Sequence, residues 1–134
     1  MAYGAILEQM PSGFNKSESG SYVGTGTYGS QNPTSLTFSF EPKLVVINYK
    51  FQGTSAIYSG MALITSKYGV HFAENSITKN IGIATLQSEL INNTLSWFLS
   101  VDRTLKKSEV AISGASPLVQ LNDIQGTYYY TAFG

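Results

Sequence analysis

The chain has 134 residues, with eight basic and eight acidic side chains, so its formal net charge is zero. Charged residues make up only 12 % of the sequence, about half the share of an ordinary soluble domain. A chain without a field of one sign is poorly suited to phosphate backbones and anionic lipid. We therefore expect one domain with an unusually neutral surface, no nucleic-acid partner and no membrane insertion.

The sequence contains no cysteine, which excludes disulfides, thiolate metal sites and a cysteine nucleophile. The first residues lack the basic region and the continuous apolar core of a signal peptide. No apolar run reaches the roughly 18 residues that a transmembrane helix needs. We therefore expect neither a signal peptide nor a membrane span, and a protein that acts outside the cell would leave it by lysis or by another route.

Residues 1–20 are predicted to form an arm rather than part of the core. Apolar residues are sparse after Leu7, and glycines and a proline interrupt a polar background. We predict two parts, an N-terminal anchoring arm at 1–20 and a β-sandwich domain at 21–134. The short apolar stretch 5–7 is suited to dock on the domain or on another subunit.

Strand signals dominate the rest of the chain. Residues 36–40 alternate apolar and hydroxyl side chains, the pattern of a strand with one buried face, and residues 44–49 are apolar on both faces, which predicts a central strand. Glycines between 21 and 29 predict a bulge or the close approach of another backbone within a strand. Further strands are predicted at 56–64, 69–73, 81–86, 94–100, 109–113, 116–121 and 126–133. This regular spacing predicts an all-β fold, an antiparallel, jelly-roll-like β-sandwich.

One segment allows a second interpretation. Leu86, Leu90 and Leu95 also fit helical spacing, and good helix formers lie between them. Against a helix, the pair Asn92-Asn93 favours a turn. The hydroxyl-flanked apolar run that follows this pair favours a strand. We expect strand, turn, strand.

The sequence offers little for catalysis. His71 is the only histidine, so a Ser-His-Asp arrangement would depend on this residue alone, and a histidine-rich metal site is excluded. The acidic residues are scattered, without the spacing that pairs two carboxylates or builds a calcium site. The glycine-rich run 24–29 lacks the Gly-Lys-Ser/Thr signature of a phosphate loop. We predict that the protein is not an enzyme and has no metal and no cofactor.

The aromatic residues suggest where binding takes place. Nine Tyr, seven Phe and one Trp exceed the needs of a small core, and tyrosine is a favoured contact residue because it buries much area at little cost in rotamer entropy. Loops carry recognition in sandwiches, and the richest loops are predicted at 52–59, 66–71 and 102–108. The predicted ligand-binding residues, a neutral surface suited to sugars, are Tyr58, Tyr68, His71 and Arg103. The alternative is that these tyrosines pack in the core, that His71 is an outward-facing strand residue, and that the loops face solvent or a neighbouring subunit.

Several stretches resemble one known group of proteins. The stretches are YVGTGTYGSQNPTSLTF at 22–38, FEPKLV at 40–45, LND at 121–123 and GTYYYTAFG at 126–134, with looser likeness in LSWF at 95–98 and GAIL at 4–7. Together they resemble the C-terminal domain of tail-fibre-like virion proteins from phages and prophages of Gram-positive bacteria. Longer members of this group carry an extended shaft before the domain, whereas only a short arm precedes it here.

The resemblance implies a phage virion protein, made in the bacterial cytoplasm, that binds a glycan or protein of the host surface. The alternative is a structural capsid-decorating or head-fibre protein without receptor-binding activity; a free lectin-like module is a third interpretation and an enzyme a fourth. Low charge and aromatic excess predict self-association, most simply as a homotrimer. The remaining expected partner is a larger virion or tail assembly, contacted through residues 1–20.

Overall fold

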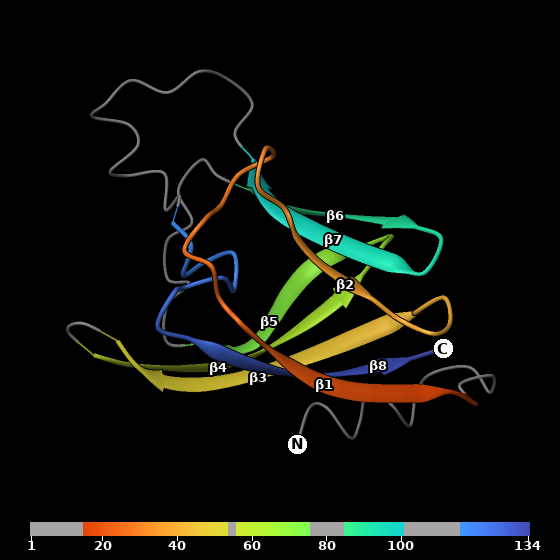
Figure 1. Ribbon diagram of the computed structural model, residues 1–134, viewed down its shortest axis with the longest axis horizontal. Helices are drawn as coiled ribbons and strands as arrows, with labels where there is room; N and C mark the ends of the chain where they lie inside the picture. The colour runs from red at the N-terminus through yellow and green to blue at the C-terminus, as the bar shows by residue number, and fades with distance from the viewer. Residues whose placement is uncertain (1–14, 54–55, 76–84, 101–115) are drawn as a thin grey trace.

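The computed structural model describes residues 15–53, 56–75, 85–100 and 116–134, and within these ranges the chain is all-β (Figure 1). No described residue belongs to a helix. The strands are β1 (Ser17–Val23), β2 (Thr34–Thr37), β3 (Leu44–Gln52), β4 (Ile57–Thr65), β5 (Gly69–Asn75), β6 (Thr85–Ile91), β7 (Thr94–Ser100) and β8 (Thr127–Phe133).

The strands form two antiparallel sheets. The larger sheet has the order β1-β8-β3-β4-β5 and the smaller has the order β2-β7-β6. Figure 1 shows the smaller sheet over one face of the larger, a sandwich-like arrangement. The strand predicted to be central, 44–49, lies in β3, the middle strand of the larger sheet, because both of its faces are apolar.

The main core lies between the two sheets. Val45 and Ile47 of β3 point into it, and Leu95 and Trp97 of β7 meet them from the smaller sheet. Burial alternates along the whole of β7, as its sequence pattern predicts. The indole N–H of the fully buried Trp97 donates a hydrogen bond to the backbone carbonyl of Gln120 at 2.9 Å, so the largest side chain of the core leaves no polar atom unpaired.

Three tyrosines pack against one another within this core. The rings of Tyr22 and Tyr128 lie parallel with centroids 5.0 Å apart, and Tyr49 lies 5.5 Å from Tyr128. The Tyr22 hydroxyl donates to the carbonyl of Leu121 at 2.9 Å. Burial raises the pKa of all three hydroxyls, and the neighbouring Tyr128 adds to the rise in the pKa of Tyr22 and Tyr49. All three side chains are therefore neutral at physiological pH.

Predictions for several strands are confirmed. The segment 86–99 forms strand, turn, strand, and Asn92 in the turn has a φ of 55°. The strands predicted at 56–64, 69–73, 94–100 and 126–133 lie within a residue or two of β4, β5, β7 and β8. The run Tyr128 to Tyr130 places rings on both faces, with Tyr128 buried and Tyr129 exposed. The prediction for 109–113 lies outside the described residues, as does most of 81–86.

The predicted arm and the first strand overlap at residues 17–20. Residues 17–20 belong to β1, which pairs with β8 from Ser17 opposite Phe133 to Val23 opposite Thr127. The hydroxyl groups of Ser19 and Thr131 form a hydrogen bond across this ladder, with their oxygens 3.0 Å apart. The pattern in the sequence hides the strand because its outward side chains are all small and polar before Val23. The anchoring arm stays a prediction for residues 1–14, which lie outside the described residues.

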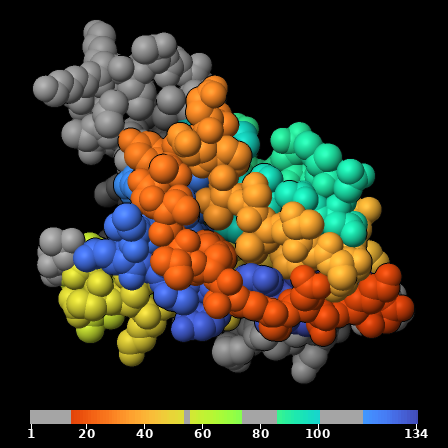
Figure 2. All heavy atoms as spheres, in the orientation of Figure 1, coloured from red at the N-terminus to blue at the C-terminus, as the bar shows by residue number. Residues whose placement is uncertain are grey.

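The strand predicted between 21 and 29 ends at Val23. Gly26 and Gly29 have φ values of 81° and 97°, in the left-handed region that glycine tolerates. Gly24 lies so close to the backbone carbonyl of Asp123 that a Cβ would overlap it, which confirms the predicted close approach of another backbone. Figure 2 shows the orange segment after β1 on the front surface, against the blue C-terminal residues.

The strand predicted at 116–121 is wrong, because this segment folds into turns. The N–H of Leu121 donates to the carbonyl of Leu118 at 3.2 Å, and the N–H of Asn122 donates to that of Pro117 at 2.8 Å. Leu121 has a φ of 60°. These short-range bonds turn the amides of Gln120 and Asn122 inward, where both are buried. The strand predicted at 36–40 lies closer to the N-terminus than expected: β2 covers Thr34–Thr37, although burial continues to alternate as far as Phe40.

Candidate functional site

The predicted binding residues do not form one surface. Tyr58 is the second residue of β4, and its ring packs against Phe51 at 5.8 Å, at the border of the main core. Tyr68 lies in the turn that follows β4, 65 % exposed, with the Lys67 ammonium 5.0 Å from its ring centre. Thr65, the last residue of β4, lies seven residue steps along the strand from Tyr58, which is roughly 23 Å at about 3.3 Å per residue.

His71 is the outward-facing strand residue of the second interpretation. It lies opposite Leu63 in the β4–β5 pairing and is exposed. Its neighbours Val70 and Phe72 point the other way and pack against the main core. Arg103, with the loop 102–108, lies outside the described residues. Of the four predicted residues, the structure therefore places Tyr68 and His71 on one hairpin and Tyr58 at the far end of β4.

The outer face of the large sheet, the face turned away from the small sheet, carries a different group of polar residues. Tyr129 of β8 is 58 % exposed there. The pairing register places Ser21 of β1 opposite it on one side and Asn48 of β3 opposite it on the other. Lys50 follows two residues after Asn48, so it lies on the same face, and all of these residues are exposed. We call Ser21, Asn48, Lys50 and Tyr129 the polar platform.

The platform has the chemistry of a sugar-binding surface. An exposed aromatic ring stacks on the apolar face of a sugar ring. The Asn48 amide donates and accepts hydrogen bonds, the Lys50 ammonium donates, and the Ser21 hydroxyl does both, which matches the mixed donors and acceptors of sugar hydroxyls. These side chains stand on β1, β8 and β3, adjacent strands of one sheet, so little backbone ordering is needed on binding.

Sequence reasoning missed the platform, although two signals were present. Asn48 and Lys50 interrupt an otherwise apolar strand at alternate positions. This pattern indicates that one face of β3 is exposed to solvent after Ile47. The run of three tyrosines guarantees an outward ring on β8. What the sequence does not show is that β8 lies beside β3, so the two signals were not connected.

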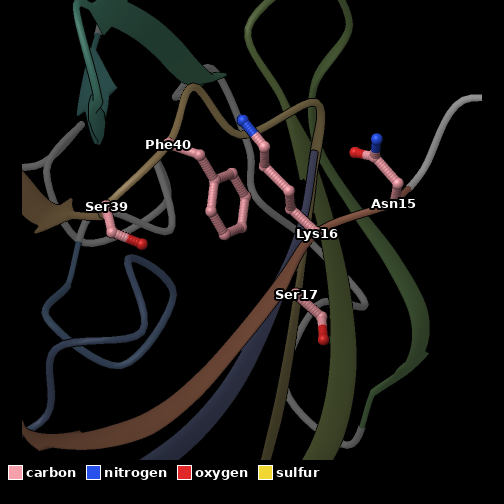
Figure 3. Close-up of a pocket in the computed structure, with 5 residues that line it drawn as sticks. All are labelled: Asn15, Lys16, Ser17, Ser39 and Phe40. Carbon is pink, nitrogen blue, oxygen red and sulfur yellow. The ribbon is translucent and has the colours of Figure 1, made fainter.

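A second candidate is a pocket at the end of the sandwich where β1 begins. Its volume is about 520 Å³, and it is open to solvent and lined by Asn15, Lys16, Ser17, Ser39 and Phe40. Figure 3 shows Phe40 in the middle of this group, with the Lys16 side chain beside it and Asn15 at the margin. Phe40 is buried and stacks with Phe38 at 6.3 Å, so its ring is part of the core and offers a ligand little surface. The platform is therefore the better candidate.

In the described ranges no three His, Asp or Glu side chains gather as they would to hold a metal ion. No helix in the same part of the chain is both long and apolar enough to cross a bilayer.

Comparisons with known proteins give no match to a family model, a curated protein or a solved structure. No residue role can be transferred from a relative. The candidate function rests on the chemistry of the platform and on the sequence resemblance described above.

Proposed function

We propose that the protein is a bacteriophage virion component that attaches to a glycan of the host surface through the polar platform. The observation that carries the proposal is the exposed ring of Tyr129, flanked by Asn48 and Lys50 on neighbouring strands. The resemblance of the two ends of the domain to tail-fibre-like proteins gives the biological setting. A neutral chain is suited to this task, because sugar hydroxyls are recognised by stacking and hydrogen bonds rather than by charge.

The platform is tested by Tyr129→Ala, with Tyr68→Ala as the matched control. Both tyrosines are about equally exposed, at 58 % and 65 %, but they lie on different parts of the molecule. Tyr129→Ala should weaken adsorption to host cells, or binding to isolated host glycan, by about two- to tenfold, since a stacked ring is worth about 0.5–1.5 kcal/mol. Calorimetry should show nearly unchanged thermal stability, because the removed ring is exposed.

The control separates two surfaces. Tyr68→Ala should leave adsorption at the wild-type level. If Tyr68→Ala abolishes adsorption while Tyr129→Ala does not, the hairpin that holds Tyr68 and His71 is the receptor site and the platform is not. If adsorption survives both substitutions, neither surface binds the host.

A second candidate function is decoration of the capsid without receptor binding. It is favoured by three large apolar side chains, Val23, Ile57 and Ile124, which are exposed at the end of the sandwich where β1 ends. Such residues are suited to contacts with another protein. Immunogold electron microscopy of purified particles separates the two functions, because a head location together with normal adsorption of particles that lack the protein supports decoration.

Three finer features belong to the same proposal. We propose a jelly-roll-like sandwich, a homotrimeric assembly, and attachment to the particle through the arm that precedes β1. The trimer is supported by the low charge of the chain and by the exposed apolar residues at one end of the sandwich. The arm is supported by its sequence, which lacks the pattern of a core.

A further inference from the structure

A second apolar cluster lies on the outer face of the large sheet. It consists of Leu44, Val46 and Met61, with Leu63 and Phe133 packed against them. Alternation along β3 shows the face, because Val45 and Ile47 point into the main core and their neighbours must point away from it. We call these five residues the outer apolar cluster. It adjoins the polar platform, since Met61 lies opposite Asn48 in the β3–β4 pairing.

Three of the five residues of the outer apolar cluster are nearly inaccessible to solvent. Leu44, Val46 and Met61 are only 2 %, 1 % and 6 % exposed. Side chains of one sheet face reach such values when another layer covers them. Among the described elements none does so: in Figure 1, β2, β6, β7 and the turns before β8 all lie on the opposite side of the large sheet. An occupant of this face must therefore come from residues outside the described ranges or from another molecule.

The connections of the chain indicate which of these residues enter beside the cluster. The segment 76–84 leads into β6, and the segment 101–115 follows β7. Both of these strands belong to the smaller sheet, which lies on the other side of the large sheet from the cluster. Residues 54 and 55 connect β3 to β4 at the far end of both strands. Residues 1–14 instead lead directly into Asn15, close to Ser17, whose pairing partner Phe133 is itself paired with Leu44. The N-terminal segment thus enters beside the cluster.

The sequence and length of this segment fit the cluster. Residues 5–7 are Ala-Ile-Leu, and Met10 is a further apolar residue three positions after Leu7. Fourteen extended residues reach about 45 Å, whereas β8, β3 and β4 span only about 10 Å across the sheet. We infer that the apolar stretch 5–7 docks on the outer apolar cluster of its own domain. This goes beyond the proposed function, because it assigns a binding site within the chain to the segment predicted to anchor the protein.

The absence of cysteine permits a direct test in the full chain. Two cysteines are introduced, Ile6→Cys with Leu63→Cys, and the matched control combines Ile6→Cys with Ile91→Cys, an exposed position on the smaller sheet, on the other side of the large sheet. Mild oxidation of dilute protein should close a disulfide within one molecule for the first pair, at a rate independent of protein concentration. The control pair should close many times more slowly.

Non-reducing gels and mass spectrometry distinguish the outcomes. A first pair that closes no faster than the control overturns the inference. A first pair that closes only between two molecules also overturns it and identifies a second copy of the chain as the occupant. Neither outcome depends on glycan binding, so it leaves the test of Tyr129 unaffected.

A second variant keeps the inference testable without cysteines. In the full chain, Ile6→Asp combined with Leu7→Asp should uncover the cluster, raising the fluorescence of a bound hydrophobic dye several-fold and speeding amide exchange in β3 and β4. Gln9→Asp, which adds charge to a polar position of the same segment, should change neither. Unchanged dye binding and exchange in the double variant, with circular dichroism confirming the fold, would contradict the docking.

Discussion

Gln120 illustrates how one buried amide can order distant segments. Its Oε1 accepts hydrogen bonds from the backbone N–H groups of Gly29 and Leu99, at 2.8 and 2.9 Å. Its Nε2 donates to the carbonyl of Asn32 at 2.9 Å and to the hydroxyl of Thr34 at 3.2 Å. All of the hydrogen-bonding capacity of this amide is used, and it joins β7 to the segment that leads into β2.

We predict that Gln120→Ala lowers the free energy of unfolding by about 2–4 kcal/mol, because two N–H groups lose their partner and a cavity opens. Gln87→Ala serves as the control, since Gln87 is exposed on β6 and its loss should cost about 0.5 kcal/mol or less. Urea unfolding followed by Trp97 fluorescence measures both. Equal stabilities of the two variants would show that the amide network contributes nothing.

Asn122 performs the same task for the neighbouring loop. Its Oδ1 accepts from the N–H of Thr25 at 3.0 Å, and its Nδ2 donates to the Thr25 hydroxyl at 2.8 Å and to the Thr27 carbonyl at 2.9 Å. Its backbone carbonyl accepts from the N–H of Gly26 at 2.8 Å. The glycine-rich run 24–29 is therefore held by a side chain about ninety-seven residues away, rather than by strand pairing.

At the scale of the element, the turn between β6 and β7 depends on one backbone conformation. Ile91 pairs with Thr94, so only Asn92 and Asn93 make the connection, and Asn92 has a φ of 55°. Asparagine and glycine adopt this left-handed conformation at low cost, whereas β-branched residues do not.

We predict that Asn92→Val destabilises the protein by about 1–2 kcal/mol, through strain in the turn. Asn92→Gly should change stability by about 0.5 kcal/mol or less, because glycine accepts the same φ. Thermal unfolding of the two variants checks this. A valine variant as stable as the glycine variant would mean that the turn relaxes to another conformation.

The strands were predictable because their signal is local. The alternation in 94–100 and the doubly apolar run in 44–49 depend only on which residues follow each other. The runs 24–29 and 116–121 carried a similar local signal, but 116–121 folds into turns, and 24–29 forms a loop held by Gln120 and Asn122, which lie far away in the sequence. No local pattern records such bonds.

The candidate site was less predictable for a related reason. Exposure of some tyrosine in the run 128–130 follows from the sequence, but the choice of Tyr129 depends on the register of β8 against β3. The same applies to Tyr58 and Tyr68, both predicted in binding loops, because only the β3–β4 and β4–β5 pairings place them at opposite ends of a strand.

At the scale of the whole molecule, neutrality and exposed apolar residues favour self-association. We predict that light scattering gives a mass about three times the 14.5 kDa of the chain, because little charge repulsion opposes contact. Ile124→Glu should lower this mass toward that of the monomer, by placing a charge among the exposed apolar residues of one end.

The control for this prediction is Ile91→Glu, at an exposed residue of the β6–β7 hairpin. Its mass should equal that of the wild type, and both variants should keep the wild-type circular dichroism. A wild-type protein that is monomeric at micromolar concentration would contradict the prediction.

The pairing of β1 with β8 determines how the molecule carries mechanical load. The chain enters β1 beside the end of β8, where the N–H groups of Asn15 and Lys16 both donate to the carbonyl of Gly134 at 3.1 Å. A pull on this entry point along the strand direction acts at right angles to the hydrogen bonds of the ladder. The seven residue pairs between Ser17 and Val23 then share the force in shear instead of opening one after another, so a tether attached ahead of β1 holds the domain in the direction in which the sheet yields least.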